Sequence, residues 1–170
     1  WPESWPEGCP FQLVHQGISA ELMARNWDLS RDELDDYAYE SHMRAMIAID
    51  KGHFDEQIIP LENKNGTGII SDEGVRRPPD REAMRNLPPA FDKEGVVTAA
   101  NSSQVSDGSA AVVIASPKIV GRYNLIPRAR VIHRHVIGSD PVLMLDGPIL
   151  ATRSILDKAG MTLPEIDIIE

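Results

Sequence analysis

Three short apolar runs, separated by helical patterns, constrain the fold of the second half of the chain. The continuous run at 110–115 is typical of a central strand, and 129–133 and 166–169 are further strand candidates. The segments between them, 117–123 and 148–160, begin with proline and continue with apolar residues at helical spacing. This alternation predicts an α/β fold whose strands are buried on both faces.

Helices dominate the first half. The capping box of residues 30–33 precedes an apolar helical face that ends at Gly52. Residues 18–27 carry a shorter amphipathic pattern, whereas the proline-rich residues 1–14 predict a surface lead-in without helix.

Turn and loop signals separate these elements. The Asn-Gly pair at 65–66 lies between β-branched runs and predicts a hairpin. The charged, proline-containing residues 72–95 predict an ordered loop with one helical turn near 81–86, followed by a strand at 96–98. A second capping box, at 162–165, predicts another short turn.

The composition is that of a folded, acidic protein. The 170 residues include 42% hydrophobic and 25% charged residues, as globular domains do. The formal net charge of −9 opposes general binding to nucleic acid or to anionic membranes. The first residues, which lack Met and the features of a signal peptide, lead us to expect a segment of a longer protein.

Cysteine and histidine offer two candidate sites. Cys9 is the single cysteine, so no internal disulfide can form, and a cytoplasmic location, or an organelle matrix in a eukaryote, is expected. A nucleophilic Cys9–His15 pair is one hypothesis, but the acidic, proline-broken surroundings favour an incidental loop thiol. His133 and His135 would share a strand face without a recognisable third ligand, so a surface pair and no metal site are predicted.

Two further patterns suggest a ligand site. Small residues from 98 to 103 would let a ligand approach the backbone, with a tight structural turn as the alternative. The cluster of Arg76, Arg77 and Arg81 suits a phosphate-bearing ligand. Its alternative is ion pairing with the acids nearest in sequence, Asp72, Glu73 and Asp80.

The order of several motifs resembles that of the thiolases. The most specific is Thr98-Ala99-Ala100-Asn101-Ser102-Ser103, which runs into Asp107-Gly108 and an apolar run. The other matching segments, in chain order, are 14–21, 30–33, 52–60, 72–76, 89–91, 95–97, 147–148 and 166–170. Thiolases transfer an acyl group between coenzyme A and an acyl-CoA carbanion, making or cleaving 3-ketoacyl-CoA.

The resemblance implies an α/β chain that forms part of the thiolase fold, in which two βαβαβαββ halves pack as five layers. It places a helix-rich loop domain with a small hairpin at 1–103. Residues 104–124 would supply the last strand and helix of the N-terminal half, and 125–170 the start of the C-terminal half. The expected partners are the remainder of the thiolase chain and further copies in a homo-oligomer, with neither nucleic acid nor membrane.

A coenzyme A site is also implied by the resemblance. His15 and Gln16 would line the active site near the reacting thioester, and Arg76 would meet the nucleotide end of coenzyme A. Ser103 would lie near the pantetheine amide. The other family positions that line the site are Met84, Phe91, Ala99 and Val105. No covalently bound cofactor is implied, because acyl-CoA and coenzyme A are the substrates.

Some family features differ or are absent. Gln16 stands where many thiolases have Met, Ala100 where Gly is usual, and Leu145 where Gly commonly precedes Gly-Pro, which suggests a bulky or steroid-like acyl group. The family's nucleophilic Cys and its acid–base motifs have no match in these 170 residues. We therefore expect a chain without turnover of its own, and a non-catalytic module that binds coenzyme A or a partner is the alternative.

Overall fold

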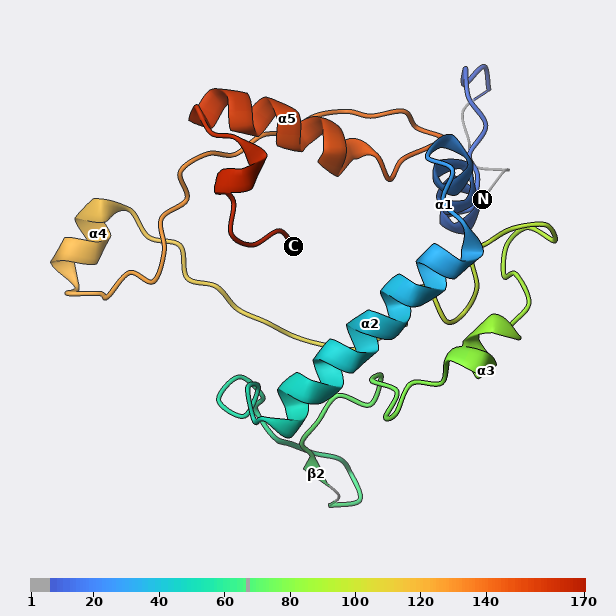
Figure 1. The fold of residues 1–170 in the computed structure, drawn as a ribbon. Helices are drawn as coiled ribbons and strands as arrows, with labels where there is room; N and C mark the ends of the chain where they lie inside the picture. Colours follow the sequence, from blue (N-terminus) through green and yellow to red (C-terminus); the bar gives the residue numbers. More distant parts are fainter. Residues whose placement is uncertain (1–6, 67) are drawn as a thin grey trace. The chain divides into compact units, whose positions relative to one another are not determined.

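The computed structural model of the chain describes residues 7–66 and 68–170 (Figure 1). Its ordered elements fall into two compact units. One unit is His15–Ser106, and the other combines Asp107–Glu170 with residues up to Val14. The predicted proline-rich lead-in begins in residues 1–6, outside the described residues, and residues 7–14 contain no helix.

The unit His15–Ser106 begins with two helices. Helix α1 covers Gln16–Asn26, and helix α2 covers Arg31–Asp50. Ser30 and Glu33 form the capping box of α2, because each side chain bonds the backbone N–H of the other. Gly52, with φ of 68°, follows the C-cap of α2 in the left-handed conformation that glycine adopts without strain. Both predicted helices are confirmed.

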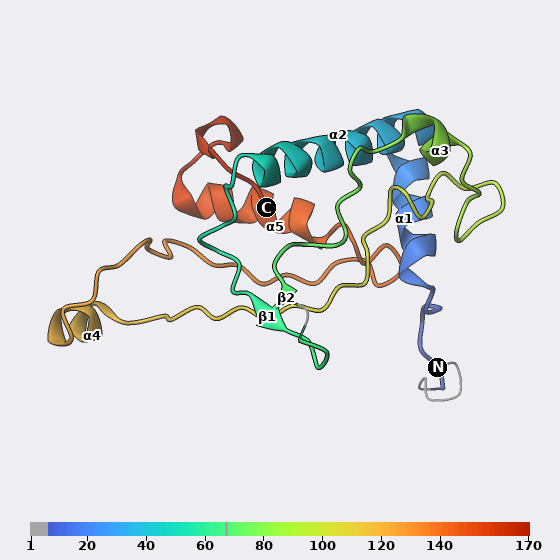
Figure 2. The ribbon, with the colours of Figure 1, turned by 90° about the horizontal axis from the view of Figure 1, so that it is seen from below.

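The region from the end of α2 to α3 also follows the predictions. Strands β1 (Leu61–Glu62) and β2 (Gly68–Ile69) pair antiparallel around the predicted turn (Figure 2). The short helix α3 (Arg81–Arg85) is capped by Asp80 and packs against α2. The hairpin and the helical turn are therefore confirmed.

The strand predicted at 96–98 is wrong. Among these residues, Thr98 alone forms a β-bridge, an isolated one with Pro89. The N–H groups of Val96 and Val97 bond to a side-chain carboxylate instead of a neighbouring strand. Val97 and Thr98 are nevertheless buried, with 8% and 0% of their surfaces exposed.

The described residues of the unit that contains Asp107–Glu170 form three helical elements. Helix α4 covers Pro117–Arg122, α5 covers Gly147–Ala159, and the 3-10 helix η2 covers Leu163–Glu165. Gly160 ends α5 with φ of 64°, and the capping box of Thr162 and Glu165 begins η2. These three predictions are confirmed.

The strands predicted at 110–115, 129–133 and 166–169 are wrong. All three segments lack strand pairing in the described residues. Val112, Val113 and Ile114 are 84%, 87% and 83% exposed, so they are far from the buried environment that their composition predicts. A strand is completed by hydrogen bonds to a neighbour, and the described residues offer these segments none.

Candidate functional site

A buried glutamate connects α1 to the segment 95–105, which contains the small residues identified in the sequence. Glu21 is 1% exposed. Its Oε2 accepts the N–H of Val96 at 3.0 Å, and its Oε1 accepts the N–H of Val97 at 2.9 Å. Gly95 approaches so closely that a Cβ there would lie 2.1 Å from Oε1. The carboxylate therefore fixes the start of the segment.

Asn101 forms a second anchor within the same segment. Its Oδ1 accepts the N–H of Thr98 at 2.8 Å, and its Nδ2 donates to the carbonyl of Val96 at 3.0 Å. The same Nδ2 donates to Oδ1 of Asp35 on α2 at 2.9 Å. The hydroxyl of Ser102 donates to the carbonyl of Thr98 at 2.7 Å. The small-residue stretch is thus a tight turn held from both helices.

Arg31 extends this network to α3. Its Nε donates to Oδ2 of Asp35 at 2.7 Å, and its Nη2 donates to the carbonyls of Met84 and Leu87 at 2.7 Å and 3.2 Å. Charged hydrogen bonds of this kind are about twice as strong as neutral ones. Met84, a residue that the family resemblance places in the coenzyme A site, is 7% exposed and so lies in the core beside this network.

The turn presents its remaining predicted site residues to solvent. Ala99 and Ser103 are exposed, and Val105 is fully so. Short side chains on a rigid, exposed backbone allow a ligand to approach N–H and carbonyl groups closely.

The aromatic part of the predicted site lies at the start of α1. His15 is the N-cap of α1, and its Nδ1 accepts the N–H of Gly17 at 3.1 Å. The imidazole ring stacks on Phe91, with centroids 5.0 Å apart. Gln16, the other predicted active-site residue, is exposed as the first residue of α1. His15, Gln16 and Phe91 are therefore close together.

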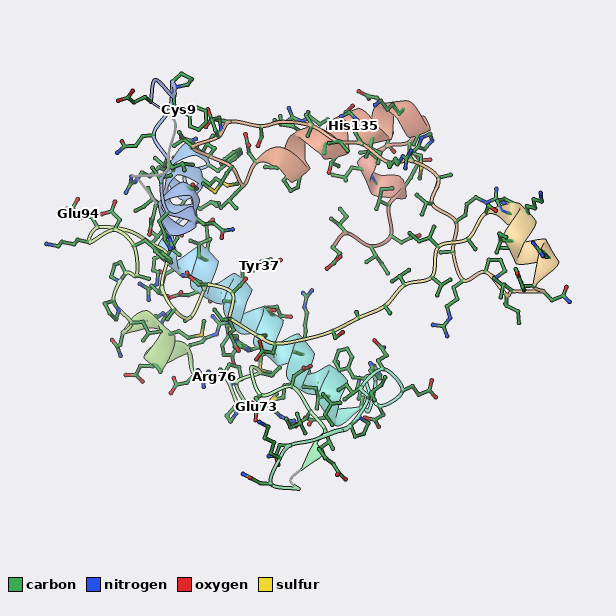
Figure 3. The ribbon with its side chains drawn as sticks, turned by 180° about the vertical axis from the view of Figure 1, so that it is seen from behind. Cys9, Tyr37, Glu73, Arg76, Glu94 and His135 are labelled. Atoms are coloured by element: carbon green, nitrogen blue, oxygen red, sulfur yellow. The ribbon has the colours of Figure 1, made fainter. Side chains whose placement is uncertain are left out.

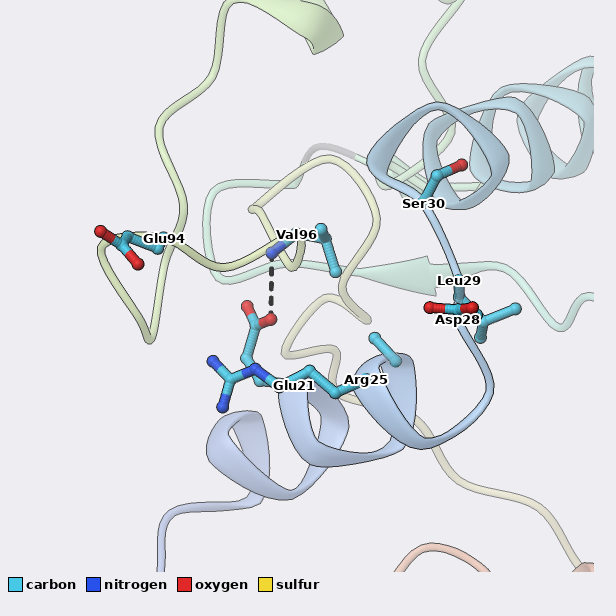
Figure 4. Close-up of a pocket in the computed structure, with 8 residues that line it drawn as sticks. Glu21, Arg25, Asp28, Leu29, Ser30, Glu94 and Val96 are labelled. Carbon is cyan, nitrogen blue, oxygen red and sulfur yellow. Dashed lines mark hydrogen bonds between the residues drawn. The ribbon is translucent and has the colours of Figure 1, made fainter.

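An ion pair between Arg25 of α1 and Asp92 holds the loop that follows Phe91. The pKa of the Asp92 carboxyl lies below its ordinary value, first because it accepts the N–H of Glu94 and second because it accepts a bond from Arg25. This loop also lines a hollow with Arg25, Leu29 and Val96 (Figure 4). None of the predicted coenzyme A residues lines that hollow.

The three clustered arginines have different surroundings. Arg77 pairs with Asp50 and Arg81 with Asp36, both acids on α2. Arg81 also lies over the ring of Tyr39, 4.1 Å from its centroid. The acids nearest in sequence are therefore not the partners of these two arginines.

All three side chains are exposed, and Arg76, labelled in Figure 3, is the one whose guanidinium has no ion-pair partner among the described residues. Its backbone N–H donates to Nδ1 of His42 on α2 at 3.3 Å. Two residues earlier, the carbonyl of Gly74 accepts a hydrogen bond from Nε2 of Gln104. This contact joins the loop of Arg76 to the residue that follows Ser103.

The structure gives little further support to the cysteine and histidine sites considered in the sequence. Cys9 is a free, half-buried thiol in the unit that contains Asp107–Glu170, whereas His15 belongs to the other unit. Nδ1 of His135 lies 2.9 Å from Nζ of Lys158. Over residues 7–66 and 68–170, no group of three metal-binding side chains comes together.

Comparisons with known proteins identify the family. The family model described as "Thiolase, N-terminal domain" matches residues 6–118. The chain belongs to the thiolase family. Its architecture is a part of the thiolase fold, because solved thiolases superpose on nearly all of it.

The relatives are thiolases of several kinds. The chain is 44% identical to the steroid 3-ketoacyl-CoA thiolase FadA6 of Mycobacterium tuberculosis, over 94% of this chain and 38% of that relative. It is 41% identical to the mitochondrial 3-ketoacyl-CoA thiolase of Rattus norvegicus, over 91% of this chain and 40% of the relative. The chain thus spans about two fifths of the length of these curated relatives.

Solved structures give the same result. The acetyl-CoA acetyltransferase of Bacillus anthracis matches with a TM-score of 0.86 and 36% identity, over 94% of this chain and 41% of that one. A human mitochondrial 3-ketoacyl-CoA thiolase in complex with CoA matches with a TM-score of 0.84 and 35% identity, over 97% and 45% of the two chains.

Sequence reasoning missed the buried acids. Carboxylates near the start of a helix interact favourably with the helix dipole, and the acidic run at 32–36 fits that role. Asp35, however, is 5% exposed, and its Oδ1 accepts a hydrogen bond from Asn101. Glu21 carried a usable signal, because it lies at helical spacing from Gly17 and Ala24, which are both buried. A carboxylate on a small-residue helix face predicts a buried acceptor for a neighbouring backbone.

Proposed function

We propose that this chain is the coenzyme A-binding segment of a thiolase-type acyl-CoA acyltransferase that makes or cleaves 3-ketoacyl-CoA. The observation that carries the proposal is the Gly74–Gln104 contact, which joins the loop of Arg76 to the 95–105 segment. A cation without an ion-pair partner and a rigid turn of small residues are what a ligand with phosphates and a narrow pantetheine arm requires.

Each predicted residue has a distinct role in this proposal. Arg76 binds phosphate at the nucleotide end of coenzyme A, since a guanidinium donates paired hydrogen bonds to phosphate oxygens. Ser103 and Ala99 contact the pantetheine arm, Phe91 and Val105 supply apolar surface to the site, and the buried Met84 supplies apolar packing. His15 and Gln16 lie toward the reacting thioester. The loop domain corresponds to 1–103, with 104–124 and 125–170 belonging to the two halves of the thiolase fold.

The chain has no turnover by itself in this proposal. A thiolase reaction needs a thiolate that attacks the acyl group and a group that moves protons to and from coenzyme A or the carbanion. Those roles belong to the family's nucleophilic Cys and acid–base motifs, which have no match in the sequence. The remainder of a thiolase chain would supply them. The complete enzyme would be a homo-oligomer located in the cytoplasm or in an organelle matrix.

The acyl group is proposed to be bulky. A relative is named a steroid 3-ketoacyl-CoA thiolase, and Gln16 is exposed at the end of α1 that carries His15. Titrations with acetyl-CoA and with a steroid-type acyl-CoA test this choice. Tighter binding of the larger thioester is expected, and equal affinity would contradict the assignment.

Calorimetric titration of the chain with coenzyme A and with pantetheine tests the main proposal. Coenzyme A should bind more tightly, because pantetheine lacks the phosphates that Arg76 meets. A thiolysis assay of the same sample should give no product. If coenzyme A does not bind, or binds no better than pantetheine, the proposed site is wrong.

Mass spectrometry distinguishes the segment from a free-standing coenzyme A-binding module. Under native conditions, protein purified from its source should contain this sequence together with the polypeptide that carries the catalytic motifs. Denaturing spectra then show whether one longer chain or several pieces are present. A native species made of the 18.8 kDa chain alone would favour the non-catalytic module.

A further inference from the structure

The 95–105 segment has an unusual source of order, because side chains accept three consecutive N–H groups near its start. Those of Val96 and Val97 bond to Glu21, and that of Thr98 bonds to Asn101. In a β-strand, the carbonyls of a neighbouring strand would accept them. The conformation of this segment therefore depends on side chains that lie outside the predicted coenzyme A contacts.

Glu21 is the member of this set that comes from the most distant part of the sequence. It lies on α1, and its two oxygens reach residues 75 and 76 positions later. Because Glu21 is 1% exposed, water does not compete with the backbone N–H groups for its two oxygens. The side chain makes no ion pair among the described residues, so the two backbone N–H groups are its principal polar partners.

We propose that Glu21 is a positioning residue for coenzyme A, holding the 95–105 segment so that Ala99 and Ser103 meet the pantetheine arm. This inference rests on the proposed function. Glu21 does not touch the ligand; it acts through Val96 and Val97. A carboxylate suits this role, because both of its oxygens accept, whereas an amide offers one acceptor and one donor.

The variant Glu21→Gln tests the role with little change of shape. Its amide nitrogen would face a backbone N–H, so one of the two hydrogen bonds is lost and the segment shifts. We expect binding of coenzyme A to weaken by about tenfold, the factor that corresponds to one lost hydrogen bond of about 1.4 kcal/mol. Pantetheine binding should weaken by the same factor, because the affected contacts are those of the arm.

Two controls separate positioning from stability and from phosphate binding. Ser30→Ala removes the N-cap of α2, so it lowers stability without touching the 95–105 segment, and its affinity for coenzyme A should stay at the wild-type value. Arg76→Ala should weaken the binding of coenzyme A and leave the binding of pantetheine unchanged. Of these three variants, Glu21→Gln alone should weaken the binding of both ligands.

Gly95→Ala disturbs the same contact from the other side, because its Cβ would lie 2.1 Å from Oε1 of Glu21. The same pattern of weakened binding is expected. If wild-type protein fails to bind coenzyme A, the proposed function is wrong. If wild type binds and both variants match it, Glu21 has no positioning role.

Amide hydrogen exchange of the wild-type chain tests the same role and does not depend on whether a variant folds. Amide hydrogen exchange reports the opening of the N–H groups of Val96 and Val97. Saturating coenzyme A should slow both amides, while the amides of Leu156 and Asp157 in α5 should not change. Unchanged exchange at Val96 and Val97 in the saturated complex would overturn the proposal.

Discussion

The imidazole ring of His15 stacks on the phenyl ring of Phe91, with centroids 5.0 Å apart and planes inclined by 26°. The pair depends on Gly17, since a Cβ at that position would lie 2.2 Å from Cγ of Phe91. A glycine in a helix costs stability, so its value here is the space that it leaves for the ring.

Gly17→Ala should therefore destabilise the unit His15–Ser106. The new methyl group overlaps Phe91, and overpacking of this kind costs about 1–3 kcal/mol. Urea unfolding followed by circular dichroism measures the loss. In a Phe91→Ala background the same change should be neutral or slightly stabilising, because the clash is gone and alanine favours helix. A similar loss in both backgrounds would show that Phe91 is not the cause.

Arg76→Ala and Arg81→Ala should differ in their effect on coenzyme A. Arg76 has no ion-pair partner among the described residues, so removing it should weaken binding by about tenfold, with a smaller difference in high salt. Arg81 is already bound to Asp36 and lies over Tyr39, so its removal should cost stability of about 1 kcal/mol or less. Equal losses of affinity would contradict this division, which calorimetric titration measures.

The arginine cluster shows how much of the site the sequence could predict. Clustered guanidinium groups indicated an anion site, but the sequence could not show which one was available. The partners of Arg77 and Arg81 are 27 and 45 residues away on α2, and only the folded chain brings them together. The division of roles within the cluster is thus a property of tertiary structure.

Helices and strands were predictable to different degrees for a physical reason. The signals for α2 and α5 are local: a capping box and a following glycine for α2, and an N-terminal proline and a terminal glycine for α5. A strand at 110–115 needs a partner from elsewhere, and an apolar composition cannot supply one. The strand predicted at 96–98 is absent for a different reason. The carboxylate of Glu21 accepts the N–H groups of Val96 and Val97, which would otherwise bond to a neighbouring strand.

The α2 capping box predicts a pH effect on stability. The pKa of Glu33 lies below its ordinary value of 4.5, first because its carboxylate accepts the N–H of Ser30 and second because it accepts the hydroxyl of Ser30. A lowered pKa in the folded state stabilises the protein above pH 4.5, and this contribution disappears as the pH falls through the folded pKa.

Glu33→Gln should consequently be less stable than wild type at neutral pH and equal to it in acid, where Glu33 is protonated. Urea unfolding at a series of pH values measures the gap. Glu56→Gln, on the exposed turn after α2, serves as the control. A gap for Glu33→Gln that does not close as the pH falls would contradict the role of the charge.

Asn101→Asp should destabilise the 95–105 segment strongly. The change removes the donor to Asp35 and to the carbonyl of Val96, and it places a second carboxylate beside the largely buried one of Asp35. The expected cost is about 2–4 kcal/mol in the free energy of unfolding. Asn65→Asp, in the exposed hairpin turn, should change stability little. Similar losses in the two variants would show that the buried contacts of Asn101 contribute nothing.

The exposed apolar run at 110–115 should make the chain self-associate. Val112, Val113 and Ile114 are more than four-fifths exposed, and full burial of each such side chain contributes about 1.5–3 kcal/mol. Contiguous exposed apolar surface of this kind marks a surface for association. Sedimentation velocity over a range of concentrations should therefore detect species larger than 18.8 kDa.

Replacing two residues of this run, Val112→Ser with Ile114→Ser, should shift the protein toward monomer. The control is Ile126→Ser, since Ile126 is 92% exposed but lies outside the run. Only the double variant should lower the association, because extended, contiguous segments can pair whereas one isolated side chain buries little area. Wild-type protein that remains monomeric at every concentration, or an equal effect of the control, would contradict the role of this run.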